Sequence, residues 1–153
     1  MIIRILVVGK IKNNFIIDGV NEYLKRISPY VEIEILNLQN FTNLPPPEAL
    51  KREEEIIFKT LKDSYYIALD QMGKPISSEE LADLLLDFSN RDKKLFLYFV
   101  IGGIFGLSEN VKKKARLVIS LSKLTFTHEF ALLILLEQIY RAFKIINREP
   151  YHY

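Results

Sequence analysis

Short apolar segments rich in β-branched residues alternate along the whole chain with segments whose apolar residues recur every three or four positions. Residues 2–8 and 95–101 are continuous apolar runs, which are typical of strands buried on both faces of a sheet. Residues 15–27 and 130–146 have the spacing of helices. Because strands and helices alternate in this way, the sequence predicts an α/β fold in which a mostly parallel sheet carries helices on both faces.

The remaining elements are bounded by turn-forming residues. The run 95–101 is the most apolar in the chain, so we expect it near the centre of the sheet. A chain of 153 residues is the size of one domain, and residues 1–153 are therefore expected to form a single domain. Further strands are predicted at 31–38, 65–69 and 117–121, a turn at 70–74, and further helices at 47–62, at 77–88 behind a Ser77–Glu80 capping box, and in a short basic segment after Ser108.

The residue types present exclude several chemistries. Cysteine is absent, which excludes disulfides, thiolate metal sites and a cysteine nucleophile. With only two histidines, His128 and His152, we expect no metal site. The first ten residues make a poor signal peptide, and the apolar run 130–136 is far shorter than the ~20 residues of a bilayer span. We therefore expect a cytoplasmic protein with no membrane partner.

Charge is unevenly distributed along the chain. Residues 1–109 contain 13 Lys or Arg and 16 Asp or Glu, whereas residues 110–153 contain 8 and 3. A basic module of this kind attracts phosphates through counterion release. Basic helix faces in contact with water are the simpler explanation of the charge alone, and nucleic acid is the alternative.

Three loops follow predicted strands, at 69–74, 102–106 and 121–127. Ligands of open α/β sheets bind beyond the carboxyl ends of the strands, so these loops are the expected ligand site. The glycine loop reads G-G-x-x-G, which matches neither the dinucleotide fingerprint nor the P-loop and disfavours a nicotinamide or ATP site. Two interpretations of the glycine loop stay open, a tight turn or a ligand loop. In the loop 121–127, Thr127 can serve as a helix cap.

The last predicted helix and the chain end carry a second group of candidates. Glu137 and Arg141 are four positions apart and share a helix face, either as a surface ion pair or as a proton acceptor beside a phosphate or base contact. Tyr151 and His152 form either a docked aromatic tail or a platform for a base and a proton. The first half of this helix is apolar on most sides, which favours a dimer.

Several of these segments together resemble one family in order and spacing. They are VVGKIK (7–12), LDQMGK (69–74), FVIGGIFGL (99–107), LSKLTFTH (121–128), LLEQIYRAFKI (135–145) and the terminal PYHY. The chain is similar over essentially its whole length to the RlmH family, the 23S rRNA pseudouridine N3-methyltransferases of the SPOUT (α/β-knot) superfamily.

This resemblance implies a deep trefoil knot formed by the C-terminal segment, a feature that the usual connection rules do not predict. It also implies a homodimer that acts on 23S rRNA in the assembled ribosome, with S-adenosylmethionine as methyl donor and no metal. The positions that match the family's cofactor contacts are Leu69, Gly102, Leu121, Ser122, Lys123, Leu124, Thr125 and Phe126.

The implied reaction requires that the N3 proton of pseudouridine leaves as N3 attacks the activated methyl group. A positioned base accelerates such a step by roughly 10²–10⁴-fold. Glu137 and His152 are our candidate proton acceptors. Arg141 and Tyr151 are candidates for orienting the base or the tail.

The chain departs from the family pattern at a few positions. Thr127 replaces the usual proline before His128, Leu132 replaces an arginine, Tyr153 replaces a charged residue, and Phe105 is bulky for its turn. The missing arginine predicts a weaker RNA affinity or rate, because leucine cannot supply a fixed positive charge. Two alternatives follow: a SPOUT methyltransferase of another RNA, such as tRNA, or a catalytically weakened ribosome- or RNA-binding module.

Overall fold

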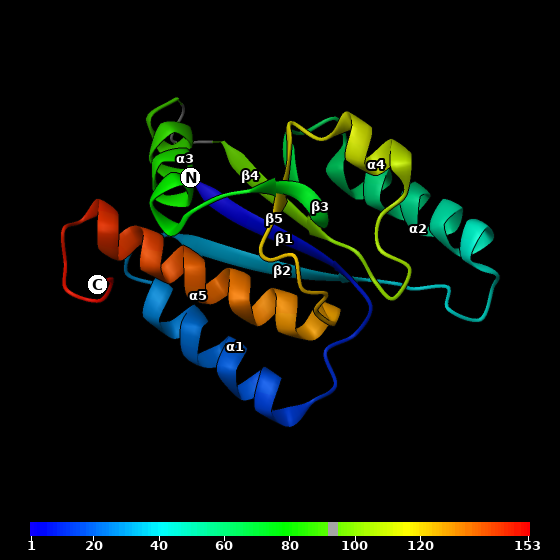
Figure 1. Cartoon of the computed structure of the whole chain (residues 1–153), viewed down its shortest axis with the longest axis horizontal. Helices are drawn as coiled ribbons and strands as arrows, with labels where there is room; N and C mark the ends of the chain where they lie inside the picture. The colour runs from blue at the N-terminus through cyan, green and yellow to red at the C-terminus, as the bar shows by residue number, and fades with distance from the viewer. Residues whose placement is uncertain (92–94) are drawn as a thin grey trace.

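The computed structural model describes residues 1–91 and 95–153, which contain one five-stranded sheet (Figure 1). All neighbouring strands are parallel, in the order β2-β1-β4-β3-β5. The most apolar strand, β4, lies in the middle, as its sequence predicts. The strands are β1 (Ile2–Val8), β2 (Glu32–Leu38), β3 (Tyr66–Pro75), β4 (Phe96–Ile101) and β5 (Leu117–Ser120).

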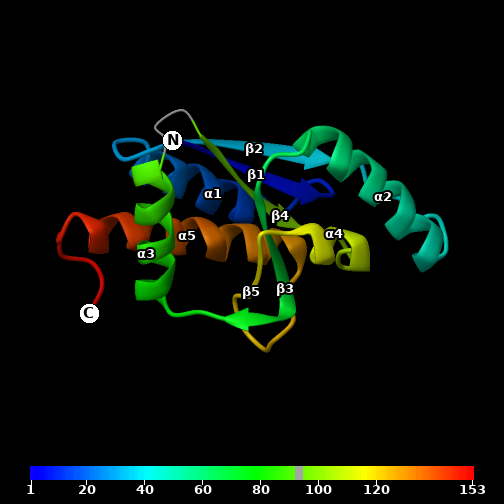
Figure 2. The ribbon, with the colours of Figure 1, turned by 90° about the horizontal axis from the view of Figure 1, so that it is seen from above.

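Helices cover both faces of this sheet, which confirms the predicted α/β architecture. Helices α1 (Asn14–Ile27), α3 (Ser78–Arg91) and α5 (His128–Ile146) pack on one face, and α2 (Pro46–Leu61) and α4 (Glu109–Lys114) on the other (Figures 1 and 2). Successive strand residues point to opposite faces, so Ile5 and Phe99 belong to the first core and Leu6 and Val100 to the second. Each such side chain stabilises the fold by about 1.5–3 kcal/mol.

Local hydrogen bonds explain where the helices begin. The Ser77 hydroxyl accepts a hydrogen bond from the Glu80 backbone N–H at 3.0 Å, and the Glu80 carboxylate accepts one from the Ser77 N–H at 3.2 Å. Ser108 and Thr127 cap α4 and α5 through their hydroxyl oxygens. The predicted capping box and both predicted caps are therefore confirmed, and each such cap is worth about 1 kcal/mol.

The prediction of a turn at 70–74 is wrong, because β3 continues to Pro75. After an irregularity in register, β3 pairs with β5 a second time, so that Ile119 is opposite both Leu69 and Lys74. A Cβ atom on Gly73 would lie 2.8 Å from the carbonyl carbon of Ile119. Gly73 therefore allows the backbones of β3 and β5 to approach each other closely. The sequence alone does not distinguish a glycine with this role from a glycine in a turn.

In the described parts of the chain, 1–91 and 95–153, no helix has the length and apolar character required to cross a bilayer.

Candidate functional site

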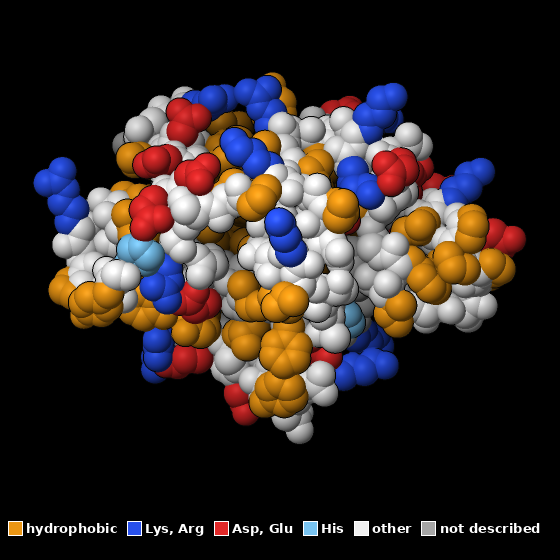
Figure 3. Space-filling model, viewed as in Figure 1, with side chains coloured by type: hydrophobic (Ala, Val, Ile, Leu, Met, Phe, Trp, Pro, Cys, Tyr) orange, Lys and Arg blue, Asp and Glu red, His pale blue; other side chains and the backbone are white. Residues whose placement is uncertain are grey.

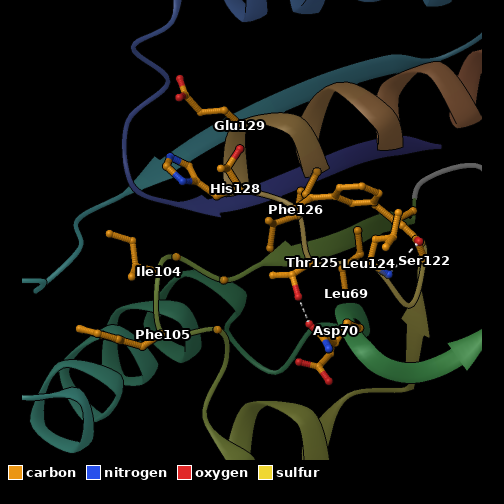
Figure 4. A pocket seen from close by; sticks show the side chains of 18 residues that line it. Leu69, Asp70, Ile104, Phe105, Ser122, Leu124, Thr125, Phe126, His128 and Glu129 are labelled. Atoms are coloured by element: carbon orange, nitrogen blue, oxygen red, sulfur yellow. Dashed lines mark hydrogen bonds between the residues drawn. The ribbon is translucent and has the colours of Figure 1, made fainter.

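A cavity of about 730 Å³ opens beside the middle of β3 and at the carboxyl ends of β4 and β5 (Figure 4). Its walls are the start of the 69–74 segment, the glycine loop 102–106, and the loop 121–127 that leads into α5. These are the three segments that the sheet argument selected. The volume lies within the range of sites that enclose a small organic molecule.

The glycine loop is both a tight turn and a wall of the cavity. A Cβ atom on Gly102 would lie 2.5 Å from the carbonyl carbon and oxygen of Gly106, so position 102 has no room for a side chain. The Gly106 N–H donates to the Gly103 carbonyl at 3.0 Å, and Gly106 adopts a φ of 74°, which favours glycine. The two interpretations left open by the sequence are therefore compatible, because the turn exposes backbone to the cavity.

Hydroxyl groups hold the loop 121–127 in shape. The Ser120 hydroxyl donates to the Ser122 carbonyl at 2.8 Å, and the Leu124 N–H donates to the Ser122 hydroxyl at 3.0 Å. The Thr125 hydroxyl donates across the cavity wall to the Gln71 side-chain carbonyl (Figure 4). These hydrogen bonds hold the loop 121–127 together and attach it to Gln71 on β3.

The first turn of α5 anchors the loop that follows β1. Glu129 accepts hydrogen bonds from the backbone N–H groups of Lys12, at 2.5 Å, and Asn13, at 3.0 Å, and from the Asn13 amide at 2.6 Å. These bonds, the Asn13 N–H first, lower the pKa of the Glu129 carboxyl. His128 contacts the Lys10 carbonyl oxygen at 2.8 Å through Nε2, which must carry the proton because a carbonyl only accepts.

The cavity contains most of the residues predicted to hold the cofactor. Lys123 is the exception, since it does not line the cavity. Sequence reasoning did not single out Asp70, Gln71 and Ile104, although the first two directly follow a predicted strand, which was an available signal. The cofactor role of the lining residues stays a prediction. The predicted residues found in the wall are Leu69, Gly102, Leu121, Ser122, Leu124, Thr125 and Phe126.

The four predicted catalytic residues meet in a second cluster, between the second half of α5 and the chain end that folds back on it. Glu137 Oε1 accepts hydrogen bonds from Arg141 Nη2 at 2.5 Å, Arg141 Nε at 3.1 Å and the Tyr151 hydroxyl at 3.0 Å. Its other oxygen accepts from the Gln138 amide at 2.8 Å. The ion pair is half-buried, and it raises the pKa of Arg141, which stays charged. We call Glu137, Arg141, Tyr151 and His152 the tail cluster.

His152 joins this cluster to α3. Its Nδ1 lies 3.1 Å from Arg141 Nη1 and its Nε2 lies 2.6 Å from a Glu79 carboxylate oxygen. A guanidinium only donates, so Nδ1 accepts, and the ring proton lies on Nε2 and is donated to Glu79. The pKa of Glu79 is lowered, first by its own backbone N–H and then by His152.

Tyr151 is docked rather than loose. Its ring packs edge-on against Tyr140, with ring centres 4.8 Å apart, and the Arg141 guanidinium lies 4.8 Å from its centre. Its hydroxyl also lies 3.4 Å from the Tyr23 hydroxyl. Burial first, and then the hydrogen bonds with Tyr23 and Glu137, raise the pKa of Tyr151, so this phenol stays protonated near neutral pH and acts as a donor.

The cavity and the tail cluster are separate sites within one chain. Ala131, the last cavity residue along α5, and Glu137 are six positions apart, which corresponds to about 9 Å along a helix. No residue of the tail cluster lines the cavity. Between the two sites, Leu132 is fully buried in the core against the sheet, so it contacts neither solvent nor an incoming macromolecule in this conformation.

Parallel strands, helices on both faces and a cavity beside the strand ends are typical of α/β proteins that bind a small ligand beside the sheet. The chain belongs to the SPOUT methyltransferase family, since the family model described as "Predicted SPOUT methyltransferase" matches residues 1–152. The match confirms the superfamily to which the motifs pointed. Within the described residues, no group of three or more His, Asp or Glu side chains is placed to hold a metal ion.

Two similar proteins identify the family more narrowly within the SPOUT methyltransferases. A protein of Dictyoglomus thermophilum named ribosomal RNA large subunit methyltransferase H is 53% identical, and the match covers 100% of both chains. A protein of the same name from Carboxydothermus hydrogenoformans is 45% identical over 99% of both chains. The RlmH resemblance drawn from the motifs is therefore confirmed.

Solved structures share the fold at low identity. A probable methyltransferase from Bordetella pertussis aligns with a TM-score of 0.58 and 13% identity, covering 92% of this chain and 93% of its own. A tRNA methyltransferase from Aquifex aeolicus aligns with a TM-score of 0.53 and 17% identity, covering 91% of this chain and 69% of its own. These alignments support the SPOUT fold alone, and the trefoil knot stays a prediction.

Proposed function

We propose that this chain is a ribosomal RNA methyltransferase that transfers a methyl group from S-adenosylmethionine to N3 of a pseudouridine in 23S rRNA. The assembled ribosome is the proposed substrate, in the cytoplasm, and a homodimer is the proposed active form. The observation that carries the proposal is the cavity, because seven of the eight residues expected to hold the cofactor line it. Full-length relatives named ribosomal RNA large subunit methyltransferase H support the RNA substrate.

The residues of the cavity fit the cofactor. The glycine loop offers backbone groups with no side chain at Gly102, which suits hydrogen bonds to a polar ligand. Leu69, Ile104 and Leu124 supply apolar contacts for an adenine ring, and the Asp70 carboxylate can pair with an amine or ribose hydroxyl. When bound, S-adenosylmethionine supplies a methyl group already activated by a sulfonium.

The contacts within the tail cluster indicate different roles for Glu137 and His152. Both Glu137 oxygens accept hydrogen bonds from Arg141, Tyr151 and Gln138, so this carboxylate has little capacity left for a further proton. Its geometry favours a positioning role, in which it holds the guanidinium and the phenol. Because His152 Nδ1 accepts from the Arg141 guanidinium, it carries a lone pair, which becomes available to the N3 proton once Arg141 turns to the substrate.

A second copy of the chain would bring the two sites together. About 9 Å of helix separates Ala131 in the cavity wall from Glu137 of the same chain, and no residue of the tail cluster lines the cavity. Phe15 and Phe130, 60% and 43% exposed, lie with ring centres 5.9 Å apart on the outer side of α1 and α5. Figure 3 shows hydrophobic side chains gathered over these helices. Covering this patch with a partner is favourable and supports the dimer.

Methyl transfer from labelled S-adenosylmethionine tests the proposal. Assembled ribosomes that lack the modification are compared with free large subunits and with tRNA. We expect label on ribosomes, mapped to N3 of one pseudouridine. Label on tRNA alone would overturn the substrate, and S-adenosylmethionine binding without transfer to any RNA would indicate the weakened binding module.

A further inference from the structure

A second groove lies at the opposite, amino end of the sheet. It encloses about 550 Å³ on the side of α2 and α4, which lie on the same face of the sheet (Figure 1). Its walls come from the end of α2, the loop into β3, and the segment between α4 and β5. The lining residues are Phe58, Leu61, Asp63, Ser64, Tyr65, Tyr66, Lys114 and Arg116. The function proposed above uses none of them.

The groove pairs aromatic rings with cations. Tyr65 is 59% exposed, and the Arg116 guanidinium lies 5.5 Å from the centre of its ring. The Lys114 ammonium lies 5.0 Å from the centre of the Phe58 ring. Tyr66 forms a fixed part of the wall, since it is buried and its hydroxyl donates to the Val111 carbonyl at 2.5 Å. An exposed tyrosine beside a planar guanidinium is a platform on which a nucleobase stacks.

The cations of the groove are not neutralised by neighbouring carboxylates. Neither Lys114 nor Arg116 forms a salt bridge with any residue that the structure describes. Lys113, also exposed, adds a further positive charge at the end of α4. The one acidic residue in the lining is Asp63, at the exposed rim. The surface is therefore suited to an anion, and the rings beside it select an anion that carries a base.

We propose that this groove binds one nucleotide of single-stranded RNA, with the base stacked on Tyr65 and the phosphate held by Arg116 and Lys114. The inference rests on the proposed function, because it assigns the groove to the same RNA that is methylated. Tyr66 and Leu69 are three residues apart on β3, which places the groove about 10 Å from the cavity wall along this strand.

Binding of a fluorescent single-stranded RNA of about 12 nucleotides to the full chain tests the groove directly. We expect Tyr65→Leu and Arg116→Gln each to weaken binding about tenfold, because stacking and the phosphate contact are lost. Tyr65→Phe keeps the ring and should bind within twofold of the original chain. Arg91→Gln is the charge-matched control, on α3 across the sheet, and should also stay within twofold.

The salt dependence and the enzymatic reaction separate this inference from the proposed function. Arg116→Gln should reduce the slope of log K against log salt by about 0.7, the value for one phosphate of a single strand. With ribosomes, Tyr65→Leu should raise KM about tenfold and leave kcat within twofold. RNA affinity that is unchanged in both variants, or lowered in Arg116→Gln alone, overturns the groove. A chain that binds RNA through Tyr65 but methylates no ribosome supports the groove and overturns the proposed function.

Discussion

The two ends of α5 carry sites built in different ways. At its amino end the cavity has one wall formed by backbone, the glycine loop, which is folded so tightly that a Cβ atom at Gly102 would overlap Gly106. At its carboxyl end the tail cluster is formed by charged and phenolic side chains that satisfy one another through Glu137. One helix therefore joins a site that requires the absence of a side chain at Gly102 to a site that requires particular side chains.

This difference determines how each site responds to substitution. A backbone-built site has no tolerance for added atoms but is insensitive to most exchanges of exposed side chains. A side-chain network loses function when one member changes charge, even where its shape is kept. The experiments below test this contrast at the cavity, at the tail cluster and at the contacts that hold each in place.

The largest effect is expected for Gly102→Ala. The new methyl group would meet backbone at 2.5 Å, which neither strand β4 nor the loop can relieve without moving the cavity wall. We expect a loss of about 3 kcal/mol in the free energy of unfolding, measured by urea titration. Methyl transfer should fall by at least about 10²-fold, because a misplacement of about 1 Å has this cost.

Gly106→Ala is the matched control for this substitution. A Cβ atom at position 106 meets nothing within 4 Å, and the only penalty arises from its φ of 74°. That conformation costs about 1–2 kcal/mol for a residue with a side chain. Equal losses in the two variants would contradict the steric explanation.

The second largest effect is expected for Glu137→Gln. The change keeps the size of the side chain but leaves the Arg141 charge without its partner and weakens the bond to Tyr151. Methyl transfer should fall about 10²-fold in kcat, while S-adenosylmethionine affinity, measured by calorimetry, stays within twofold. Full activity in this variant would remove Glu137 from the catalytic arrangement.

Glu22→Gln is a matched control for the tail cluster. Arg26 and Glu22 are also four positions apart on a helix, but their side chains are more exposed. An exposed pair of this kind contributes little to stability because water screens it, so stability and activity should be nearly unchanged. A loss similar to that of Glu137→Gln would show that any surface ion pair has this effect.

A pH-dependent effect is expected for Glu129→Gln at the amino end of α5. The amide keeps one accepting oxygen for the loop but places its NH₂ group against the Asn13 amide. At neutral pH we expect a loss of about 2 kcal/mol in unfolding free energy. The folded-state pKa of Glu129 is lowered, so its contribution is present above the ordinary glutamate pKa and is lost as pH falls through the folded value. The two proteins should therefore become equally stable in acid; a gap that persists there would contradict this account.

The smallest effect is expected for Glu79→Gln. Glu79 is exposed and contacts only one edge of the tail cluster, through His152 Nε2. Because the Arg141 and Tyr151 contacts hold the tail without it, methyl transfer should change by less than about threefold. Hydrogen exchange of the tail should become faster while the core of α5 is unaffected. A loss as large as that of Glu137→Gln would mean that His152 is oriented from α3 rather than from α5.

Much of the fold could be predicted from the residues. The central position of β4 follows from its continuous apolar run, because only a strand covered on both faces needs one. The helix caps at Ser77, Ser108 and Thr127 follow from local hydrogen bonding. The continuation of β3 through Gly73 could not be predicted, since the reason for that glycine is the backbone of β5, 45 residues or more away in sequence.

The features of the candidate site also fall into two groups, those that the sequence determines and those that only the tertiary structure determines. The alternation of buried strands and helices, the loops after β4 and β5 and the pairing of Glu137 with Arg141 are local properties, which the residue spacing specifies. Tertiary structure alone decided that the loops enclose one cavity, that His152 reaches Glu79 across 73 positions, and that Leu132 is buried. The physical reason is that packing, not spacing, sets which distant segments meet and which side chains lose contact with water.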